Sequence, residues 1–428
     1  MLLLLVLQYL RPQDFWGPLY GERVVFLSMM VLAPAWFYTL SSKKVLRTPE
    51  ELFLFLLWVV VILSCVFSDV LSAFDFGITF GKTLLCCLFA AHAIDTRRKL
   101  EGAIWMTVFT LFIVALLAGP LPERQGQYAS IGMFSDRNDF AHVIAIMLPL
   151  AAAFVLEGRL WEKAVGAVTL VVGVMAAIAS QSRGSQLACI LGVFSLFYWR
   201  AKSKGTRALM LAAAVPVLLV AMSLGGRLGT VSGYRQDRSA MGRVWVWAEA
   251  LGMFQAHPVL GVGYGKFQVY GERAAHSAYM LALAELGATG LFVYMGLLFF
   301  AVRHVNDAVT NPPHPRIRVI ALGMAGALVG HMVAALFLSS LYQVHLLVLL
   351  AMFSSLRLVT DMERTRLLVP SEAALPGSAA VSVPGAWELS RGAGFIAPWL
   401  VTGNDLMKIA GLTFGCWLAY KIFVMMSG

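Results

Sequence analysis

Arg183, Arg243 and His276 are the side chains of this sequence whose types and positions suggest chemistry. The planar guanidinium of an arginine matches phosphate oxygens with two parallel hydrogen bonds. A neutral imidazole accepts a proton, as a general base acting on a hydroxyl must do. All three residues lie at polar interruptions of an apolar chain. They are therefore candidates for binding a phosphate-bearing substrate and for activating a hydroxyl group.

The two arginines lie in different settings. Arg183 occupies the short turn SQSRGSQ (180–186) between two apolar runs, which would hold it at a membrane surface. Arg243 stands at the predicted start of a loop helix, where the helix N-terminus attracts anions. Each arginine has an equally good structural explanation, because Arg183 could bind lipid headgroups by snorkelling and Arg243 could be a solvated surface residue.

His276 begins the apolar run 276–301, at the boundary between membrane and water. A helix N-terminus disfavours imidazolium, so we expect a lowered pKa and a neutral ring there. A single histidine in this position is more often a cap or a packing residue. The two arginines expected on the same side of the membrane, and the neighbouring glycine and aromatic residues, favour the catalytic role.

Other polar residues near these three are further candidates. Arg137 could join a diphosphate site, whereas Asn138 is expected to cap the helix over 138–157, although it is also a possible substrate-binding residue. The loop that carries Arg243 adds three possible substrate-binding residues, Tyr264, Lys266 and Arg273.

Ionisable residues also lie inside apolar runs, where they are costly and often functional. Glu285 is expected on the opposite face of its helix from His276. His331 and His345 are expected to be packing groups or polar groups of a pore. The sequence has no carboxylate or Cys/His cluster with metal-ligand spacing, so we expect neither a metal nor another cofactor.

Membrane-spanning helices are the elements that must position these residues. Of the 428 residues, 59% are hydrophobic and 13% are charged, whereas soluble domains carry about 25% charged residues. The fold class is therefore all-α, a polytopic helical membrane protein with about 12 transmembrane helices. The apolar runs are 1–10, which is too short to span alone, and 23–40, 51–67, 77–94, 102–119, 138–157, 163–180, 185–199, 207–224, 276–301, 317–338, 341–357 and 406–426.

Basic connections between the runs predict the topology. If the runs alternate in direction, these connections all fall on one side, which the positive-inside rule makes cytoplasmic. They are 41–47, 95–99, 158–163, 199–207, 303–318 and 357–366. The net charge of +10 is partly this signature, so no nucleic-acid partner is expected. The loop 225–275 then lies outside the cytoplasm, and its excess of basic residues favours an anionic lipid-linked substrate.

The chain divides into three predicted segments, which are a transmembrane catalytic domain over 1–366, a flexible cytoplasmic linker over 367–404 and a C-terminal hydrophobic helix over 405–428. Within the long loop, a helix is predicted from Ser239 to Ala256, closed by His257-Pro258. One apolar face would let this helix lie along the membrane surface. GVGYG (261–265) is predicted to be a turn.

The sequence from about 130 to 300 resembles the core of the O-antigen ligase and polymerase superfamily. GRVWVWAEALGMFQAHPVLGVGYGKF (242–267) and AAHSAYMLALAELGATGLFVYMGLL (274–298) follow its order of motifs. The matching positions are Arg243, Trp247, His257, Pro258, Gly261, Gly263, Gly265, Phe267, His276, Ser277, Glu285, Gly287 and Gly290. Ser277 departs from the common His-Asn pair. SQSRGSQ (180–186) and MFSDRNDFA (133–141) also resemble motifs of the superfamily.

The resemblance implies an all-helical, metal-independent glycosyltransferase of the bacterial inner membrane, with its active site facing the periplasm. Such an enzyme moves a glycan from undecaprenyl diphosphate to an acceptor hydroxyl. By matching position, Arg183 and Arg243 would hold the diphosphate and His276 would activate the hydroxyl. Our preferred interpretation is an inverting O-antigen ligase whose acceptor is a lipid A–core sugar, with membrane lipids as further partners.

Three alternatives stay open. A polymerase would use a second polyprenyl-linked repeat unit as the acceptor, and a ligase could serve another exopolysaccharide. A transporter of lipid-linked glycan would bind the same headgroup without chemistry. Transporters typically have polar residues through the middle of the membrane and two related halves, and the sequence shows little of either.

Overall fold

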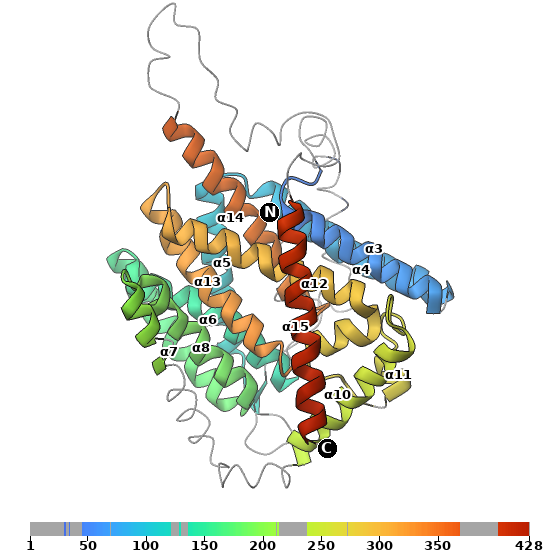
Figure 1. The fold of residues 1–428 in the computed structure, drawn as a ribbon. Helices are drawn as coiled ribbons and strands as arrows, with labels where there is room; N and C mark the ends of the chain where they lie inside the picture. Colours follow the sequence, from blue (N-terminus) through green and yellow to red (C-terminus); the bar gives the residue numbers. More distant parts are fainter. Residues whose placement is uncertain are drawn as a thin grey trace, which may run out of the picture.

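The computed structural model describes residues 45–68, 70–120, 128–129, 136–210, 212–213, 238–271, 273–368 and 401–427, together with Met30 and Pro34. Its helices are α3 (Pro49–Ser68), α4 (Val70–Ala93), α5 (Arg97–Leu116), α6 (Arg137–Glu157), α7 (Leu160–Ala179), α8 (Arg183–Arg200), α10 (Arg238–Ala256), α11 (Phe267–Gly271), α12 (Ala278–Thr310), α13 (Pro315–Ala334), α14 (Val344–Leu368) and α15 (Gly403–Ser427) (Figure 1). Between α5 and α6, β1 (Gly119–Pro120) pairs antiparallel with β2 (Tyr128–Ala129).

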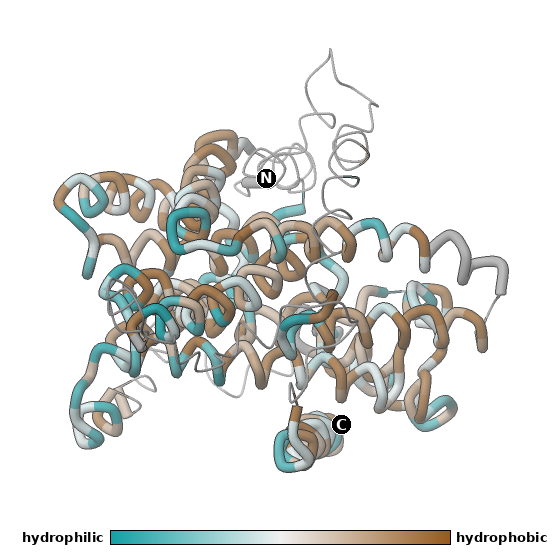
Figure 2. Tube along the Cα trace, turned by 90° about the horizontal axis from the view of Figure 1, so that it is seen from above, coloured by the Kyte–Doolittle hydropathy of each residue, from teal (hydrophilic) through white to brown (hydrophobic). Residues whose placement is uncertain are grey.

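The helices follow the predicted apolar runs. Within the described residues, α3 to α8 and α12 to α15 each coincide with one run, and eight of these helices are long and apolar enough to cross a membrane. Figure 2 shows hydrophobic residues along much of their lengths. The protein is therefore a multi-pass helical membrane protein, as predicted. The runs 1–10, 23–40 and 207–224, the first part of the long loop and most of the linker lie wholly or largely outside the described residues.

The predicted basic connections lie at one end of the bundle, where several of them form ion pairs. We call this end the charged end. Arg316 at the start of α13 donates to Glu101 of α5 at 2.5 Å and to Glu162 of α7 at 2.6 Å and 2.8 Å. The same end holds the pairs Arg200–Glu157, Arg318–Glu157, Arg364–Asp307 and Arg303–Asp405. Successive helices thus alternate in direction, as the charge pattern predicts. Which end faces the cytoplasm stays a prediction.

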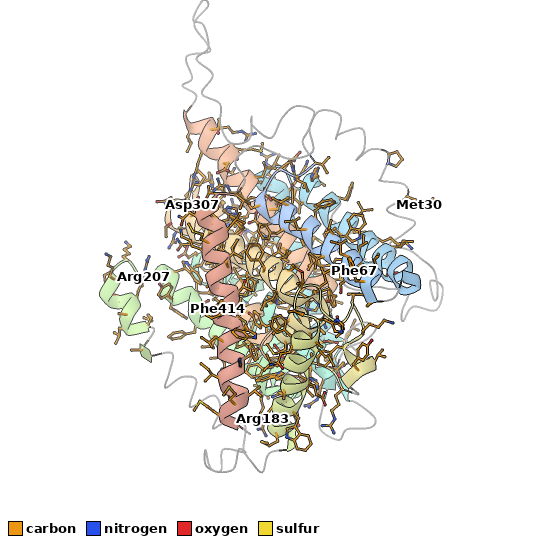
Figure 3. The ribbon with its side chains drawn as sticks, turned by 45° about the vertical axis from the view of Figure 1, so that its right-hand side comes forward. Met30, Phe67, Arg183, Arg207, Asp307 and Phe414 are labelled. Atoms are coloured by element: carbon orange, nitrogen blue, oxygen red, sulfur yellow. The ribbon has the colours of Figure 1, made fainter. Side chains whose placement is uncertain are left out.

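The opposite end is the site end, where α6, α8, α12 and α14 begin and where α10 lies. Figure 3 labels Asp307 and Arg183 at opposite ends of the bundle. Helices α6 and α13 approach closely toward this end, because a side chain at Gly330 would collide with the carbonyl oxygen of Ala145. Small residues permit such close packing between membrane helices.

Helix α12 is broken at Gly287, whose backbone has φ 67° and ψ −162°. The loop 258–263 fills the break, and a side chain at Gly287 would collide with its backbone. Four backbone hydrogen bonds join loop and helix, from Val262 N to Ala284 O (2.9 Å), from Gly263 N to Glu285 O (3.0 Å), from Ala288 N to Pro258 O (2.9 Å) and from Thr289 N to Val259 O (3.3 Å). The loop thereby satisfies backbone groups that a break inside a membrane would otherwise expose.

The loop helix α10 begins one residue before its predicted start and ends where predicted. It packs against α12 and α15, and its Val246 and Ala250 are buried. Helix α15 runs beside α12, since Asp405 near its start pairs with Arg303 at 2.7 Å and Tyr420 near its end shares a hydrogen bond with Ser277 at 2.9 Å. Figure 1 shows α15 across the front of the bundle, with α10 beside its C-terminal end, and Figure 2 shows the C-terminal helix at the edge of the bundle.

Candidate functional site

The turn that carries Arg183 is tied to the start of α6. Gln181 has a positive φ of 52°, which folds the chain sharply between α7 and α8. Ser182 Oγ donates to Asn138 Oδ1 at 3.0 Å, and Arg137 Nη1 donates to Gln181 O at 3.2 Å. Arg183 follows as the first residue of α8, with its side chain exposed at the site end. The structure thus brings three candidate residues from two segments together.

The cap of α6 differs from the prediction. Asp136, not Asn138, is the N-cap, and its Oδ1 accepts hydrogen bonds from Asn138 N at 2.7 Å and Asp139 N at 3.3 Å. A capping side chain must precede the helix, and the helix begins one residue earlier than the apolar pattern indicated. The Asn138 side chain is therefore available to hold Ser182, the residue before Arg183.

Arg243 lies in the second turn of α10, which begins at Arg238, so the prediction that it opens the helix was wrong. Its guanidinium carbon is 5.6 Å from the centroid of the Phe337 ring, within the range of a cation–π contact. A side chain at Gly184 would meet the same ring at 2.8 Å, so Phe337 also packs against the residue that follows Arg183. Phe337 therefore contacts both the Arg243 side chain and the residue that follows Arg183.

His276 lies immediately before α12 in a left-handed conformation with φ 47°, which histidine tolerates better than most residues. The backbone on both sides is fixed, because Trp247 Nε1 donates to Ala275 O at 3.1 Å and Ala278 N donates to Ala335 O at 2.8 Å. The cap of α12 is Ser277, whose side chain accepts from Met280 N at 3.3 Å. His276 is consequently not the cap, and its half-buried ring is available for another role.

The electrostatic setting of His276 favours a neutral imidazole. Partial burial lowers its pKa below the usual value, and the positive charges of Arg243 and then Arg273 lower it further. The negative charge of Asp136 acts in the opposite direction, and its effect lies between those of the two arginines. The pKa of His276 is thus lowered, as expected, and burial and the two arginines are causes that the sequence did not indicate.

Arg273 joins this group, because its Nη1 lies 3.5 Å from the position of a side chain at Gly242. Tyr264 and Lys266 lie on the loop beside the break in α12. Tyr264 packs edge-on against Tyr342 with ring centroids 4.4 Å apart, and burial raises its pKa to about 12. The structure therefore places Arg273 beside Arg243 and His276, and places Tyr264 in an aromatic cluster.

Glu285 supports the loop from inside the bundle. Its Oε1 accepts a hydrogen bond from Phe267 N at 3.0 Å, at the start of α11, and its carbonyl oxygen accepts from Ser64 Oγ at 2.7 Å. Glu285 thus holds the segment after GVGYG against α12. Glu285 and Gly287 of α12 thus pack against the loop around Gly261, a contact that the sequence alone did not reveal.

Phe337 contacts both the Arg243 guanidinium and the position of Gly184, which follows Arg183. Arg137 and Asn138 are tied to the Arg183 turn, and Arg273 and His276 lie near Arg243. The sequence pattern did not single out Phe337, because it lies near the end of the predicted apolar run 317–338. Among the described residues, no group of three His, Cys, Asp or Glu side chains has the arrangement of a metal site.

Comparisons with known proteins agree with the resemblance. Residues 168–295 match the family model described as O-antigen ligase. The chain is also similar to the exopolysaccharide production protein ExoQ of Rhizobium meliloti (strain 1021), with 28% identity over 261 residues that cover 53% of this chain and 58% of the relative. The match thus spans less than two-thirds of the relative's length. Both findings support the O-antigen ligase and polymerase superfamily, whose members are membrane glycan ligases and polymerases.

Proposed function

We propose that this protein is an inverting glycan transferase that moves a glycan from undecaprenyl diphosphate to an acceptor hydroxyl at the site end. The contact of Phe337 with Arg243 and with the Arg183 turn, and the nearness of His276 to Arg243, carry the proposal, because they combine cations suited to a diphosphate with a neutral base. The family match over 168–295 supports the same reaction class.

Arg183 and Arg243 are assigned to the diphosphate of the donor. Their guanidinium groups present paired donors to phosphate oxygens and neutralise the charge that develops on the leaving group. Arg183 starts a helix whose preceding turn is held by Asn138 and Arg137, and the Arg243 side chain packs over Phe337. Arg273 adds a third positive charge beside Arg243.

His276 is assigned to the acceptor. The acceptor oxygen attacks the anomeric carbon while its proton passes to the neutral imidazole. The bond between the anomeric carbon and the diphosphate oxygen breaks, and its electron pair leaves with the lipid diphosphate. A single displacement of this kind inverts the anomeric configuration. His276 then releases its proton to solvent.

Two acceptors have support. The description of the matched family favours ligation to a lipid A–core sugar. The similarity to an exopolysaccharide production protein favours extension of a polyprenyl-linked repeat or transfer to another exopolysaccharide. The same donor site and base serve either acceptor, since the reactions differ only in which hydroxyl approaches His276.

The site end is proposed to face the periplasm of a bacterial inner membrane, since the charged end carries the basic connections. Single cysteines replacing Val269, which is 70% exposed at the site end, and Asn311, which is exposed at the charged end, test this in a background without native cysteines. An impermeant thiol reagent should label only the first on intact cells. Labelling of the second alone would reverse the orientation.

Transfer is tested with purified protein, undecaprenyl-diphosphate glycan and both acceptors in competition. Glycan on lipid A–core identifies a ligase, whereas lengthened polyprenyl-linked glycan identifies a polymerase. Donor binding without transfer to either acceptor, combined with movement of donor across vesicles, would instead indicate a transporter.

A further inference from the structure

Five side chains beneath the site form a continuous hydrogen-bonded chain across four segments. They are Tyr294 of α12, His331 of α13, His142 and Asp139 of α6, and Gln343 directly before α14. The links are Tyr294 OH to His331 Nε2 (2.8 Å), His331 Nδ1 to His142 Nε2 (3.2 Å), His142 Nδ1 to Gln343 Oε1 (3.2 Å) and Gln343 Nε2 to Asp139 Oδ1 (2.6 Å). The three ring residues are fully buried or nearly so.

The chemistry of each group sets the direction of this chain. Gln343 turns its amide nitrogen toward the Asp139 carboxylate, so its oxygen faces His142 and can only accept. His142 therefore carries its proton on Nδ1, and its bare Nε2 accepts from His331 Nδ1–H. The bare Nε2 of His331 then accepts from the Tyr294 hydroxyl. In this arrangement every donor points toward Asp139, which predicts the Nδ1–H tautomer at both histidines.

His345 extends the same arrangement. Its Nε2 lies 3.1 Å from His142 Nδ1, which already carries a proton in this direction. His345 Nε2 is therefore an acceptor that shares this proton with Gln343. The interior placement of three histidines at the junction of α6, α13 and α14 is thus explained by one directional network rather than by separate packing.

The chain connects the two halves of the proposed site. At one end, Asp139 lies one residue beyond Asn138, which holds Ser182 and hence the Arg183 turn. Toward the other end, His331 lies in the last turn of α13, where His331 O accepts from Ala335 N and Ala335 O accepts from Ala278 N, two residues after His276. The aromatic ring beneath Arg243 follows in the same connection.

We propose that the directional chain from Tyr294 to Asp139 positions the turn that carries Arg183 relative to Arg243 and His276. The kinetic consequence of this inference rests on the proposed function, whereas its prediction of the histidine tautomers does not. The chain needs an oxygen acceptor at residue 139 and an amide at residue 343. The positioning role does not require that a negative charge at residue 139 act on the substrate.

Imidazole nitrogen NMR of histidine-labelled protein in lipid bilayers tests the direction of the chain. Signals of His142 and His331 are assigned from their loss in His142→Gln and His331→Gln. The expected result is the Nδ1–H tautomer at both positions. The Nε2–H tautomer at both would mean a reversed chain with Asp139 protonated, and would overturn the inference.

Steady-state kinetics test the positioning role. Gln343→Met keeps the length of the side chain but breaks the network, and should raise the donor KM or lower kcat/KM for donor by up to about 100-fold, as small misplacements do. Asp139→Asn keeps an acceptor oxygen and should stay near wild type, whereas Asp139→Leu should resemble Gln343→Met. The acceptor KM should change little in each.

The variants must be folded for the comparison, which an unchanged size-exclusion profile and melting temperature establish. A Gln343→Met protein with wild-type donor kinetics would overturn the positioning role, as would an Asp139→Asn protein as impaired as Asp139→Leu. If wild-type protein transfers no glycan, the proposed function fails, while the tautomer measurement still decides whether the directional chain exists.

Discussion

Phe337 offers a sharp test of how the donor site is built. Replacing it by leucine keeps an apolar side chain beneath Gly184 but removes the aromatic face that lies 5.6 Å from the Arg243 guanidinium carbon. A partly exposed cation–π contact contributes about 0.5–1 kcal/mol. If that energy holds Arg243 in its binding orientation, donor affinity should fall about 2- to 5-fold, since 1.4 kcal/mol corresponds to tenfold.

Donor binding to purified protein, measured by titration with a fluorescent undecaprenyl-diphosphate sugar, reports this change. Phe337→Tyr retains the ring and should bind like wild type, whereas Phe337→Leu should not. Leu336→Ala, at the exposed neighbouring position, controls for a general effect on the turn. In an Arg243→Gln background, Phe337→Leu should cost nothing further. Equal binding by the Leu and Tyr variants would refute the role assigned to the ring.

Three other predictions address the base, the charged end and the broken helix. Turnover should rise with pH through the lowered pKa of His276 and then level off. Asp136→Asn retains a capping side chain but removes the charge that raises the pKa of His276, so it should move the rising limb of the pH–rate profile to lower pH. A rising limb that does not move would contradict the coupling between Asp136 and His276. Arg316→Met leaves Glu101 and Glu162 without their shared cation and should lower the free energy of unfolding by about 3 kcal/mol, seen as a lower melting temperature. The control Arg366→Met removes an exposed ion pair and should leave the melting temperature nearly unchanged. Gly287→Ala should prevent accumulation of folded protein because its side chain would strike the loop backbone at a positive φ, while Gly411→Ala, which meets nothing within 4 Å, should fold normally.

The sequence predicted the helices well because their signals are local. Long apolar runs and basic connections each depend on neighbouring residues, and α10 could be placed from its polar flanks and from His257-Pro258. The charge pattern also predicted the alternation of helices, which the ion pairs of Arg316 at the charged end support.

Features that depend on contacts between distant segments could not be predicted in the same way. The break at Gly287 becomes stable only when residues 258–263 supply its hydrogen bonds. Phe337 has no chemical signal of its own until Arg243 and Gly184 meet it. His331 and His345 were expected to be packing or pore groups, and their shared network with His142 requires three helices that are far apart in the sequence.

The most direct test of the central claim is the turnover of His276→Gln, measured in folded protein together with donor affinity. The variant keeps a polar side chain but cannot act as a base. We predict nearly unchanged donor affinity and turnover lowered by about 10²–10⁴-fold, the contribution expected of a general base. Turnover at the wild-type rate, with donor still bound, would contradict the assignment of His276 and require another group to accept the proton of the acceptor hydroxyl.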